Sequence, residues 1–216
     1  MKTTSTIKKI TSAMKTISTT KMKGDRDRLE NGKLFGMKAL DMVFKTDEFL
    51  QRKMPGEVGE ASTVVVPISS DKGFCGAINS SIVRDVKRMI KPANRSQYQI
   101  FSVGDKGTTG LVRVYPDLLK NAITHVAAPV NYPSMMAIAG QVSNMAEDAD
   151  KILIVHNFFV SAIAYEQRHV ELMTRSTFLD VMQYGKLYDM KLPDKNTSNT
   201  ALYELYLTAN LYVAFL

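Results

Sequence analysis

The N-terminal stretch of the chain constrains the fold most, because it reads as one uninterrupted helix. Its apolar residues recur at intervals of three, four and three residues, as in a coiled coil. This apolar seam consists of Ile7, Ile10, Met14 and Ile17. No proline occurs before Pro55, so the spacing predicts a continuous helix over residues 5–50. At about 1.5 Å per residue this helix would be about 70 Å long, longer than a domain of this size is wide, so it must project.

A projecting helix with a narrow apolar stripe needs a partner, because most helices gain their stability by packing that stripe against another element. Beyond Ile17 the seam weakens, since Lys21, Gly24 and Arg28 take its next positions. Periodicity alone leaves two interpretations open. Either another helix lies along the stripe, or the helix folds back on the rest of the chain as an ordinary solvated helix.

The positive charge of the chain is concentrated at this end. The 216 residues carry a formal net charge of +7, and no acidic residue precedes Asp25. The basic residues before it are Lys2, Lys8, Lys9, Lys15, Lys21 and Lys23. Such a surface suits nucleic acid, anionic lipid or an acidic protein. Nucleic acid is disfavoured, because Ser and Thr separate the lysines and no aromatic residue precedes Phe35. An organelle transit peptide is also basic and free of acids, and is a further interpretation.

After a linker at residues 54–62, the pattern changes to alternating strands and helices. Strands are expected at 63–68, 98–103, 123–126 and 151–158, with an antiparallel edge strand at 162–172. Helices are expected at 77–90, after a turn at 104–110, and at 133–147. The last of these has an apolar face of Met136, Ala139, Val142 and Met145. The alternation predicts a mostly parallel sheet covered by helices, a small Rossmann-like α/β domain over residues 63–180.

The C-terminal part combines a loop with a second long helix. Residues 176–196 are rich in loop-forming residues, and a helix is expected over 199–216. Its apolar side consists of Leu202, Leu205, Tyr206, Ala209, Tyr212 and Val213. The predicted organisation is a helix at 1–53, a linker at 54–62, the α/β domain at 63–180, a loop at 181–198 and a helix at 199–216.

The turn after the first strand stands where phosphate-binding loops occur, so it is the first place to look for an active site. It contains Ser70, Asp71, Lys72, Gly73, Cys75 and Gly76. Lys72 precedes Gly73, whereas a P-loop has its lysine directly after the last glycine. A dinucleotide fingerprint needs GxGxxG, and only GxxG is present. The spacing therefore disfavours a nucleotide site, and a Rossmann-like enzyme is kept as an alternative.

The remaining chemistry-bearing residues do not predict a catalytic, cofactor or metal site. Cys75 is the single cysteine, which excludes an intrachain disulfide. Its place beside a helix start would suit a nucleophile, but we interpret it as a small apolar side chain. The three histidines, His125, His156 and His169, have no metal-ligand spacing. No stretch of about 18 apolar residues occurs, so a membrane span is not predicted.

Three segments resemble one known family, the gamma subunits of rotary ATP synthases. Residues 6–17, followed by Lys21 and Met22, are similar to the opening of these subunits. Residues 69–79 resemble their central-domain signature, with Phe74 where leucine is usual. Residues 205–216 resemble the start of their C-terminal helix. The resemblance also accounts for the basic N-terminal stretch, which weakens the transit-peptide interpretation.

The resemblance implies a rotor shaft without an active site of its own. In the family, the N- and C-terminal helices form an antiparallel coiled coil inside a hexamer of alpha and beta subunits. Rotation of the coiled coil couples proton flow to ATP synthesis on the beta subunits. The apolar seam would pack on the partner helix. The residues that would face acidic loops of the hexamer are Lys8, Lys9, Lys15, Lys21 and Lys23.

Further expectations concern the far end of the shaft and its location. The loop around Tyr188 and Asp189 resembles the foot that meets the membrane ring of c subunits and small stalk subunits of the delta or epsilon type. The family continues beyond the position of Leu216, so a truncated chain, a split gene or a shortened shaft is implied. We expect a helix absent from this sequence to cover the apolar seam. The implied location is the matrix side of the mitochondrial inner membrane, with the cytoplasmic side of a bacterial plasma membrane as the alternative.

Overall fold

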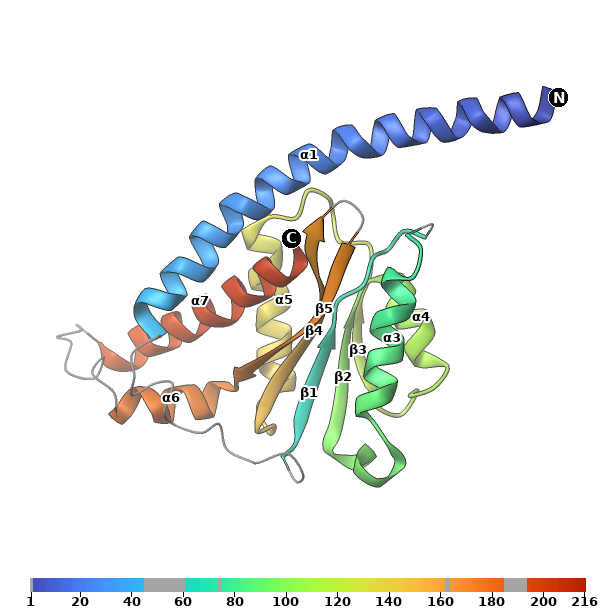
Figure 1. Ribbon diagram of the computed structural model, residues 1–216. Helices are drawn as coiled ribbons and strands as arrows, with labels where there is room; N and C mark the ends of the chain where they lie inside the picture. The colour runs from blue at the N-terminus through green and yellow to red at the C-terminus, as the bar shows by residue number, and fades with distance from the viewer. Residues whose placement is uncertain (1, 45–60, 74, 162–163, 185–193) are drawn as a thin grey trace.

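The computed structural model describes residues 2–44, 61–73, 75–161, 164–184 and 194–216 (Figure 1). Its helices are α1 (Lys2–Phe44), α3 (Ile78–Met89), the 3-10 helix η1 (Pro92–Gln97), α4 (Asp105–Val112), α5 (Tyr132–Met145), α6 (Arg175–Tyr184) and α7 (Lys195–Phe215). Its strands are β1 (Thr63–Pro67), β2 (Tyr98–Val103), β3 (Leu119–Ile123), β4 (Lys151–Ser161) and β5 (Ala164–Met173).

The strands form one sheet in the order β3-β2-β1-β4-β5. The first four are parallel, and β5 pairs antiparallel with β4 at the edge. The side chains of Val64, Val65 and Val66 in the central strand are fully buried, as expected where helices cover both faces of a parallel sheet. The predicted α/β class, the mostly parallel sheet and the antiparallel edge strand are confirmed.

Alternate residues of β1, β2 and β4 supply two cores, one on each face of the sheet. On one face, Val65 packs with Ile82 and Val86 of α3 and with Leu111 of α4. On the other face lie side chains of α5, α6 and α7, among them Ile138, Phe178 and Tyr206. Figure 1 shows α3 and α4 on one side of the sheet and α5 and α7 on the other. Helix α7 is therefore part of the domain core as well as a neighbour of α1.

Helix α1 is continuous over 43 residues, which corresponds to about 65 Å. Figure 1 shows its N-terminal half pointing away from the sheet and its C-terminal half running beside α7 in the opposite direction. Leu29 is the first buried residue of α1. A Cβ on Gly32 would lie 2.3 Å from Cδ1 of Leu216, so the missing side chain lets α7 come close. The predicted long projecting helix, with the C-terminal helix antiparallel beside it, is confirmed over the described residues.

Two predicted boundaries inside the sheet region are wrong. Strand β3 occupies Leu119–Ile123 and not 123–126. Its three central residues are exposed, so it lacks the apolar run by which a strand is recognised in a sequence. Helix α4 begins at Asp105, so Gly107 and Gly110 are helical and do not form a turn. Both glycines allow close packing, since a Cβ would lie 2.5 Å from Oγ of Ser69 at Gly107 and 2.8 Å from Cγ2 of Val83 at Gly110.

The predicted loop over 176–196 is also wrong where the structure describes it. Residues 175–184 form α6, because Phe178 and Met182, one turn apart, anchor the helix in the core. Helix α7 starts at Lys195 and not at residue 199, because the carboxylate of Asp194 accepts a hydrogen bond from the amide of Asn196 and caps the helix. The predicted domain boundaries at 181 and 198 therefore fall inside helices, and residues 185–193 lie outside the described residues.

Tertiary contacts bury the predicted apolar faces of two helices only in part. Ala139 and Val142 of α5 and Tyr206 and Ala209 of α7 are buried as predicted. Helix α5 buries Met135, Ile138, Ala139 and Val142, whereas Met136 remains 48% exposed. Both stripes have helical spacing, so the sequence alone does not choose between them. Helix α7 packs on α1, α5 and α6 and therefore buries more than one side. Its buried residues are Tyr203, Tyr206, Leu207, Thr208, Ala209, Leu211 and Ala214.

Candidate functional site

The projecting half of α1 presents the predicted apolar seam to solvent. Every residue from Thr3 to Arg28 is exposed. The exposed fractions of the seam residues are 59% for Ile7, 55% for Ile10, 58% for Met14 and 60% for Ile17. Helix α7 meets α1 near Gly32 and does not reach the seam. Exposed apolar residues aligned at coiled-coil spacing are typical of a surface that packs on another helix.

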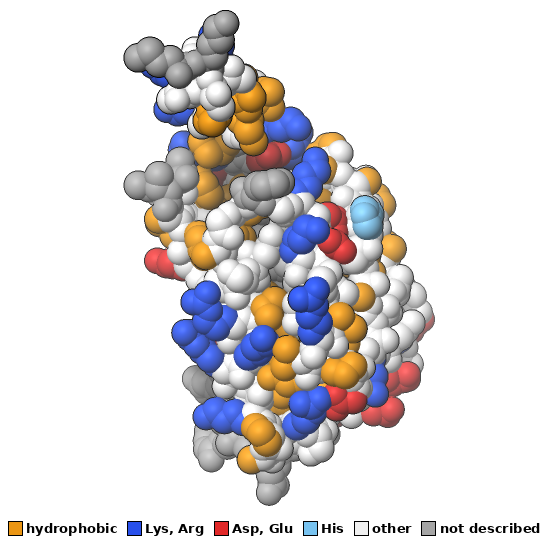
Figure 2. Space-filling model, turned by 90° about the vertical axis from the view of Figure 1, so that its right-hand side faces the viewer, with side chains coloured by type: hydrophobic (Ala, Val, Ile, Leu, Met, Phe, Trp, Pro, Cys, Tyr) orange, Lys and Arg blue, Asp and Glu red, His pale blue; other side chains and the backbone are white. Residues whose placement is uncertain are grey.

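The lysines beside the seam carry charge that the described residues do not neutralise. Lys8, Lys9, Lys15, Lys21 and Lys23 are all exposed, and none forms an ion pair with a residue that the structure describes. The first acidic side chain, Asp25, accepts a 2.6 Å hydrogen bond from Nη1 of Arg28. Figure 2 shows basic and hydrophobic side chains next to each other on this helix, at the top of the view. The projecting helix can therefore bind an acidic partner that also covers the seam.

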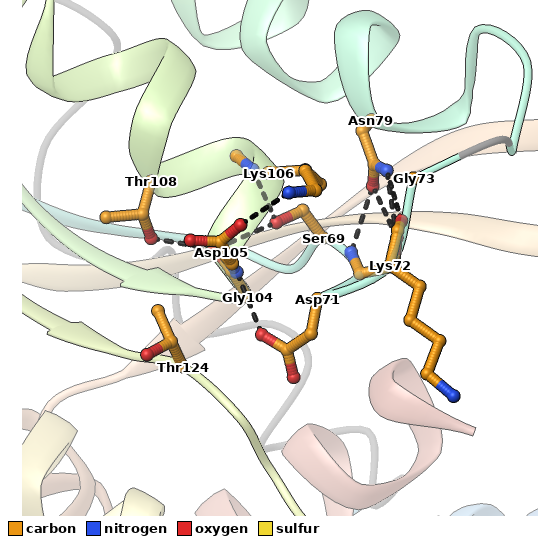
Figure 3. Close-up of polar contacts among 12 residues, drawn as sticks. Ser69, Asp71, Lys72, Gly73, Asn79, Gly104, Asp105, Lys106, Thr108 and Thr124 are labelled. Atoms are coloured by element: carbon orange, nitrogen blue, oxygen red, sulfur yellow. Dashed lines mark hydrogen bonds and ion pairs between the residues drawn. The ribbon is translucent and has the colours of Figure 1, made fainter.

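The predicted signature turn lies at the carboxyl end of β1, where it joins three parts of the domain (Figure 3). Oδ1 of Asp71 accepts a 2.9 Å hydrogen bond from the amide of Asp105, and Oδ2 accepts a 3.1 Å bond from the amide of Val126. The carboxylate thus holds both the first residue of α4 and the segment after β3. Its acceptor oxygens are used within the protein.

A second set of contacts closes the turn on itself. Asn79, in the first turn of α3, accepts a hydrogen bond from the amide of Ser70 through Oδ1 and donates from Nδ2 to Oγ of Ser70. The Ser70 hydroxyl donates to the carbonyl of Lys72 at 2.7 Å. The thiol of Cys75 donates to the carbonyl of Gly73 at 3.2 Å. The residues of the turn are brought together mainly by bonds to its own backbone.

Ser69 joins the ends of β1 and β2 beneath the turn. Its hydroxyl lies 3.1 Å from the carbonyl oxygen of Val103 and accepts a 2.9 Å bond from the amide of Gly107. Gly104 has a φ of 98°, and a Cβ there would lie 2.1 Å from the carbonyl oxygen of Ser69. Only glycine fits this close approach. The carboxyl end of the sheet, where nucleotides bind in Rossmann folds, is thus filled by protein groups at this point.

A basic groove of about 500 Å³ runs from the signature turn between α3 and α4. Arg84, Lys87 and Lys106 line it, and none of its lining residues is acidic. Nζ of Lys106 lies 2.7 Å from Oδ2 of Asp105 and lowers the pKa of that carboxyl. Figure 2, viewed from the side of α3 and α4, shows basic side chains gathered over this face. Sequence reasoning missed this groove, although Arg84 and Lys87, three residues apart, predict one basic helix face.

Two of the three histidines lie on β4 and β5, away from the turn, whereas His125 lies in the segment after β3, directly before Val126. His156 is buried, its Nδ1 has no hydrogen-bond partner among the described residues, and burial lowers its pKa to about 4. Nε2 of His169 lies 2.5 Å from Oδ2 of Asp85 in α3. This pair connects the edge strand to α3 and was not predicted. The described residues contain no group of three His, Cys, Asp or Glu side chains arranged to hold a metal ion.

Two further predictions concern the membrane. Among the described helices, none has both the length and the hydropathy that crossing a bilayer requires. Tyr188 and Asp189, predicted to form the foot of the shaft, lie outside the described residues.

Comparison with known proteins assigns this architecture to one family. A family model described as ATP synthase matches residues 1–216. The chain is 28% identical over 193 residues to the mitochondrial ATP synthase subunit gamma of Saccharomyces cerevisiae, covering 86% of this chain and 60% of the yeast protein. It is 23% identical over 167 residues to the corresponding subunit of Dictyostelium discoideum, covering 76% of this chain and 55% of that protein. The chain thus spans little more than half the length of these relatives.

A solved structure is similar over nearly the whole chain. It is a chain in the cryo-EM structure of the central stalk and c-ring of the Tetrahymena thermophila mitochondrial ATP synthase, with a TM-score of 0.84 and 40% sequence identity. The similarity covers 95% of this chain and 90% of that one. A rotor chain of the Euglena gracilis mitochondrial ATP synthase, 18% identical with a TM-score of 0.52, shares the fold. The chain belongs to the ATP synthase family, and the relatives it resembles are gamma subunits.

Proposed function

We propose that this chain is the central-stalk (gamma) subunit of a rotary ATP synthase. It turns inside a hexamer of alpha and beta subunits and couples proton flow through a membrane ring of c subunits to ATP synthesis on the beta subunits. One observation carries the proposal, namely the projecting half of α1 with its exposed seam and unneutralised lysines. Membership of the family and the similarity to the Tetrahymena central stalk support it.

Each surface of the projecting helix has its own task in this proposal. The seam from Ile7 to Ile17 packs on a further helix, which removes its apolar side chains from water. Lys8, Lys9 and Lys15, with the lysines that follow, face acidic loops of the surrounding hexamer. Helices α1 and α7 form the shaft, and the α/β domain forms its base outside the hexamer. The segment around Tyr188 and Asp189 is the foot that meets the c-ring and the small stalk subunits.

The chain in this proposal is mechanical and has no active site. Support comes from the signature turn, where the carboxylate of Asp71 is occupied by the amides of Asp105 and Val126. The spacing of Lys72 and Gly73 differs from that of a phosphate-binding loop. The location is the matrix side of the mitochondrial inner membrane, since the yeast, Dictyostelium and Tetrahymena proteins it resembles are mitochondrial.

The proposal is tested by purifying the assembly through this chain and weighing it by native mass spectrometry. We expect one copy of the chain with a hexamer of ATPase subunits. Denaturing the same sample then gives the mass of the chain itself, which is 24.1 kDa for these 216 residues. Recovery of an isolated monomer from native cells would contradict the rotor role.

A variant pair tests the seam directly. Ile10→Gln with Met14→Gln replaces two exposed seam residues, so the free energy of unfolding of the isolated chain should change by less than about 0.5 kcal/mol. Incorporation into the assembly should nevertheless fall strongly, because the buried contact is lost. The matched control, Ser12→Gln with Thr16→Gln, introduces the same side chains on the opposite side of α1 and should assemble normally. Equal incorporation of both variants would show that the seam is not a packing surface.

A further inference from the structure

The basic groove between α3 and α4 has the size of a small-molecule site. Its volume is about 500 Å³, and ligand pockets typically occupy about 300–1,000 Å³. The signature turn contributes Gly73, Cys75 and Gly76 to its lining, and α4 contributes Lys106 and Gly110. Helix α3 supplies the facing wall. The proposed rotor function makes no use of this groove.

Two cationic side chains on the α3 wall have no counter-ion among the described residues. Arg84 and Lys87 lie three residues apart on one face of the helix, and neither forms an ion pair with a residue that the structure describes. The acidic residue between them, Asp85, is instead paired with the edge strand, since its Oδ2 lies 2.5 Å from Nε2 of His169. The positive charge that α3 brings to the groove is therefore left unneutralised.

The third cation, Lys106, stands on the opposite wall in the first turn of α4. Its side chain lies beside the signature turn, because a Cβ on Gly73 would be 3.9 Å from Cε of Lys106. Nζ of Lys106 lies 2.7 Å from Oδ2 of Asp105, and the two side chains are 44% and 35% exposed. An ion pair this exposed contributes little, so the ammonium group can turn to a ligand at small cost.

The rest of the lining favours a compact anion over a nucleotide base or a peptide. Of the described residues that line the groove, none is acidic or aromatic, and Val83 alone is aliphatic. Bases and peptides are held mainly by apolar and aromatic side chains, which this lining hardly offers. Gly73 and Gly76 have no side chains, so the oxygens of an anion can come close to the backbone of the turn.

We propose that this groove binds a diphosphate group, either free or at the end of a larger compound. The guanidinium of Arg84 presents parallel N–H groups that match the oxygens of one phosphate, with Lys87 beside it. The second phosphate lies against Lys106 on the other wall. The bound anion thus ties α3 and α4 to the signature turn. The inference concerns the α/β domain and is independent of the proposed rotor function.

Titration of the full chain with sodium pyrophosphate, orthophosphate and ADP tests the site. The titrations contain no magnesium and are made at equal ionic strength, while NMR follows the amide resonances of Gly76 and Gly110. We expect saturable shifts at both glycines and tighter binding of pyrophosphate than of orthophosphate, because only the diphosphate reaches both walls. ADP should bind no more tightly than pyrophosphate, since the described lining holds no base. Shifts that do not saturate, or tighter binding of ADP or orthophosphate, would overturn the assignment.

Two double variants that each remove two positive charges separate the groove from the general charge of the chain. Arg84→Gln with Lys87→Gln removes both cations of the α3 wall and should weaken pyrophosphate binding at least about tenfold. The matched control, Arg113→Gln with Lys120→Gln, removes two exposed cations that do not line the groove and should bind normally. Equal weakening in both variants would overturn the site, because it would show attraction to net charge alone.

A substitution that changes only charge gives a second test. Ser80 lines the groove, is exposed and lies in the first turn of α3, where a carboxylate is compatible with the helix. Ser80→Glu should therefore fold normally and abolish pyrophosphate binding, whereas Ser80→Gln, of the same size, should retain it. Binding that persists in Ser80→Glu would overturn the proposal. A tetraglutamate peptide that bound more tightly than pyrophosphate would also overturn it and identify the groove as a contact for an acidic protein.

Discussion

The carboxylate of Asp71 joins two distant segments at the signature turn, so its replacement should lower the stability of the fold by a measurable amount. Its carboxylate accepts hydrogen bonds from the amides of Asp105 and Val126, at 2.9 and 3.1 Å. A hydrogen bond to a charged group contributes about 1.5–3 kcal/mol. Because Asp71 is only partly buried, water can accept hydrogen bonds from the two amides when the carboxylate is removed, which recovers part of the lost free energy. We therefore expect Asp71→Ala to lower the free energy of unfolding by about 2–4 kcal/mol.

The conservative variant refines this expectation. Asp71→Asn keeps one acceptor oxygen but turns an amide group toward the other backbone N–H, so the expected loss is about 1–2 kcal/mol. Urea denaturation followed by circular dichroism measures both losses. Thermal melting gives an independent reading, since 1 kcal/mol shifts the Tm of a domain this large by about 2–4 °C.

Asp148→Ala is the control for the Asp71 variants. Asp148 is exposed and has no hydrogen bond or ion pair to any residue that the structure describes, so Asp148→Ala should change stability by less than about 0.5 kcal/mol. If Asp71→Ala proved as stable as this control, the carboxylate would not be holding α4 and the segment after β3. If the same variant also lost binding of a phosphate compound, the turn would be a ligand site.

The remaining predictions concern close packing and pH. Gly104 and Gly76 both have a positive φ, of 98° and 61° respectively. A Cβ on Gly104 would lie 2.1 Å from the carbonyl oxygen of Ser69, whereas a Cβ on Gly76 would meet nothing within 4 Å. Gly76→Ala should thus lose about 1–2 kcal/mol in urea denaturation and Gly104→Ala clearly more; equal losses would contradict the packing. Burial lowers the pKa of His156 from 6.5 to about 4, so its neutral form stabilises the fold fully above about pH 6.5. This contribution to the free energy of unfolding, about 3 kcal/mol, is lost as the pH falls toward 4. In urea denaturation across that pH range, His156→Gln should lose less stability than the unmodified chain. Identical pH profiles of the two proteins would refute the role of His156.

Regular patterns in the sequence predicted the main elements of the fold. The proline-free stretch with seam residues such as Ile7 and Ile10 predicted the long projecting helix. The β-branched run over residues 63–68 predicted a buried strand, and β1 is buried throughout. These signals suffice because they are local, since helix and strand periodicity depend on neighbours a few residues away. The resemblance to gamma subunits came from contiguous motifs for the same reason.

Elements without a strong local pattern were missed or misplaced. Strand β3 has exposed central residues, and α6 depends on two core contacts, Phe178 and Met182. The rotation of α5, which buries Met135 and leaves Met136 exposed, follows from its packing against the sheet and α7. In each case a non-local contact outweighs a weak or ambiguous local preference.

The sequence by itself determined that this chain has a long basic helix with an apolar seam joined to an α/β domain of the ATP synthase family. Only the tertiary structure decided what its polar residues do. Asp71 stands where a catalytic acid could stand, yet its partners Asp105 and Val126 lie 34 and 55 residues away in the sequence. The basic groove beside Lys106 likewise exists only where α3 and α4 meet. Hydrogen bonds and cavities depend on distances in space, and these are fixed only when segments far apart in the chain pack together.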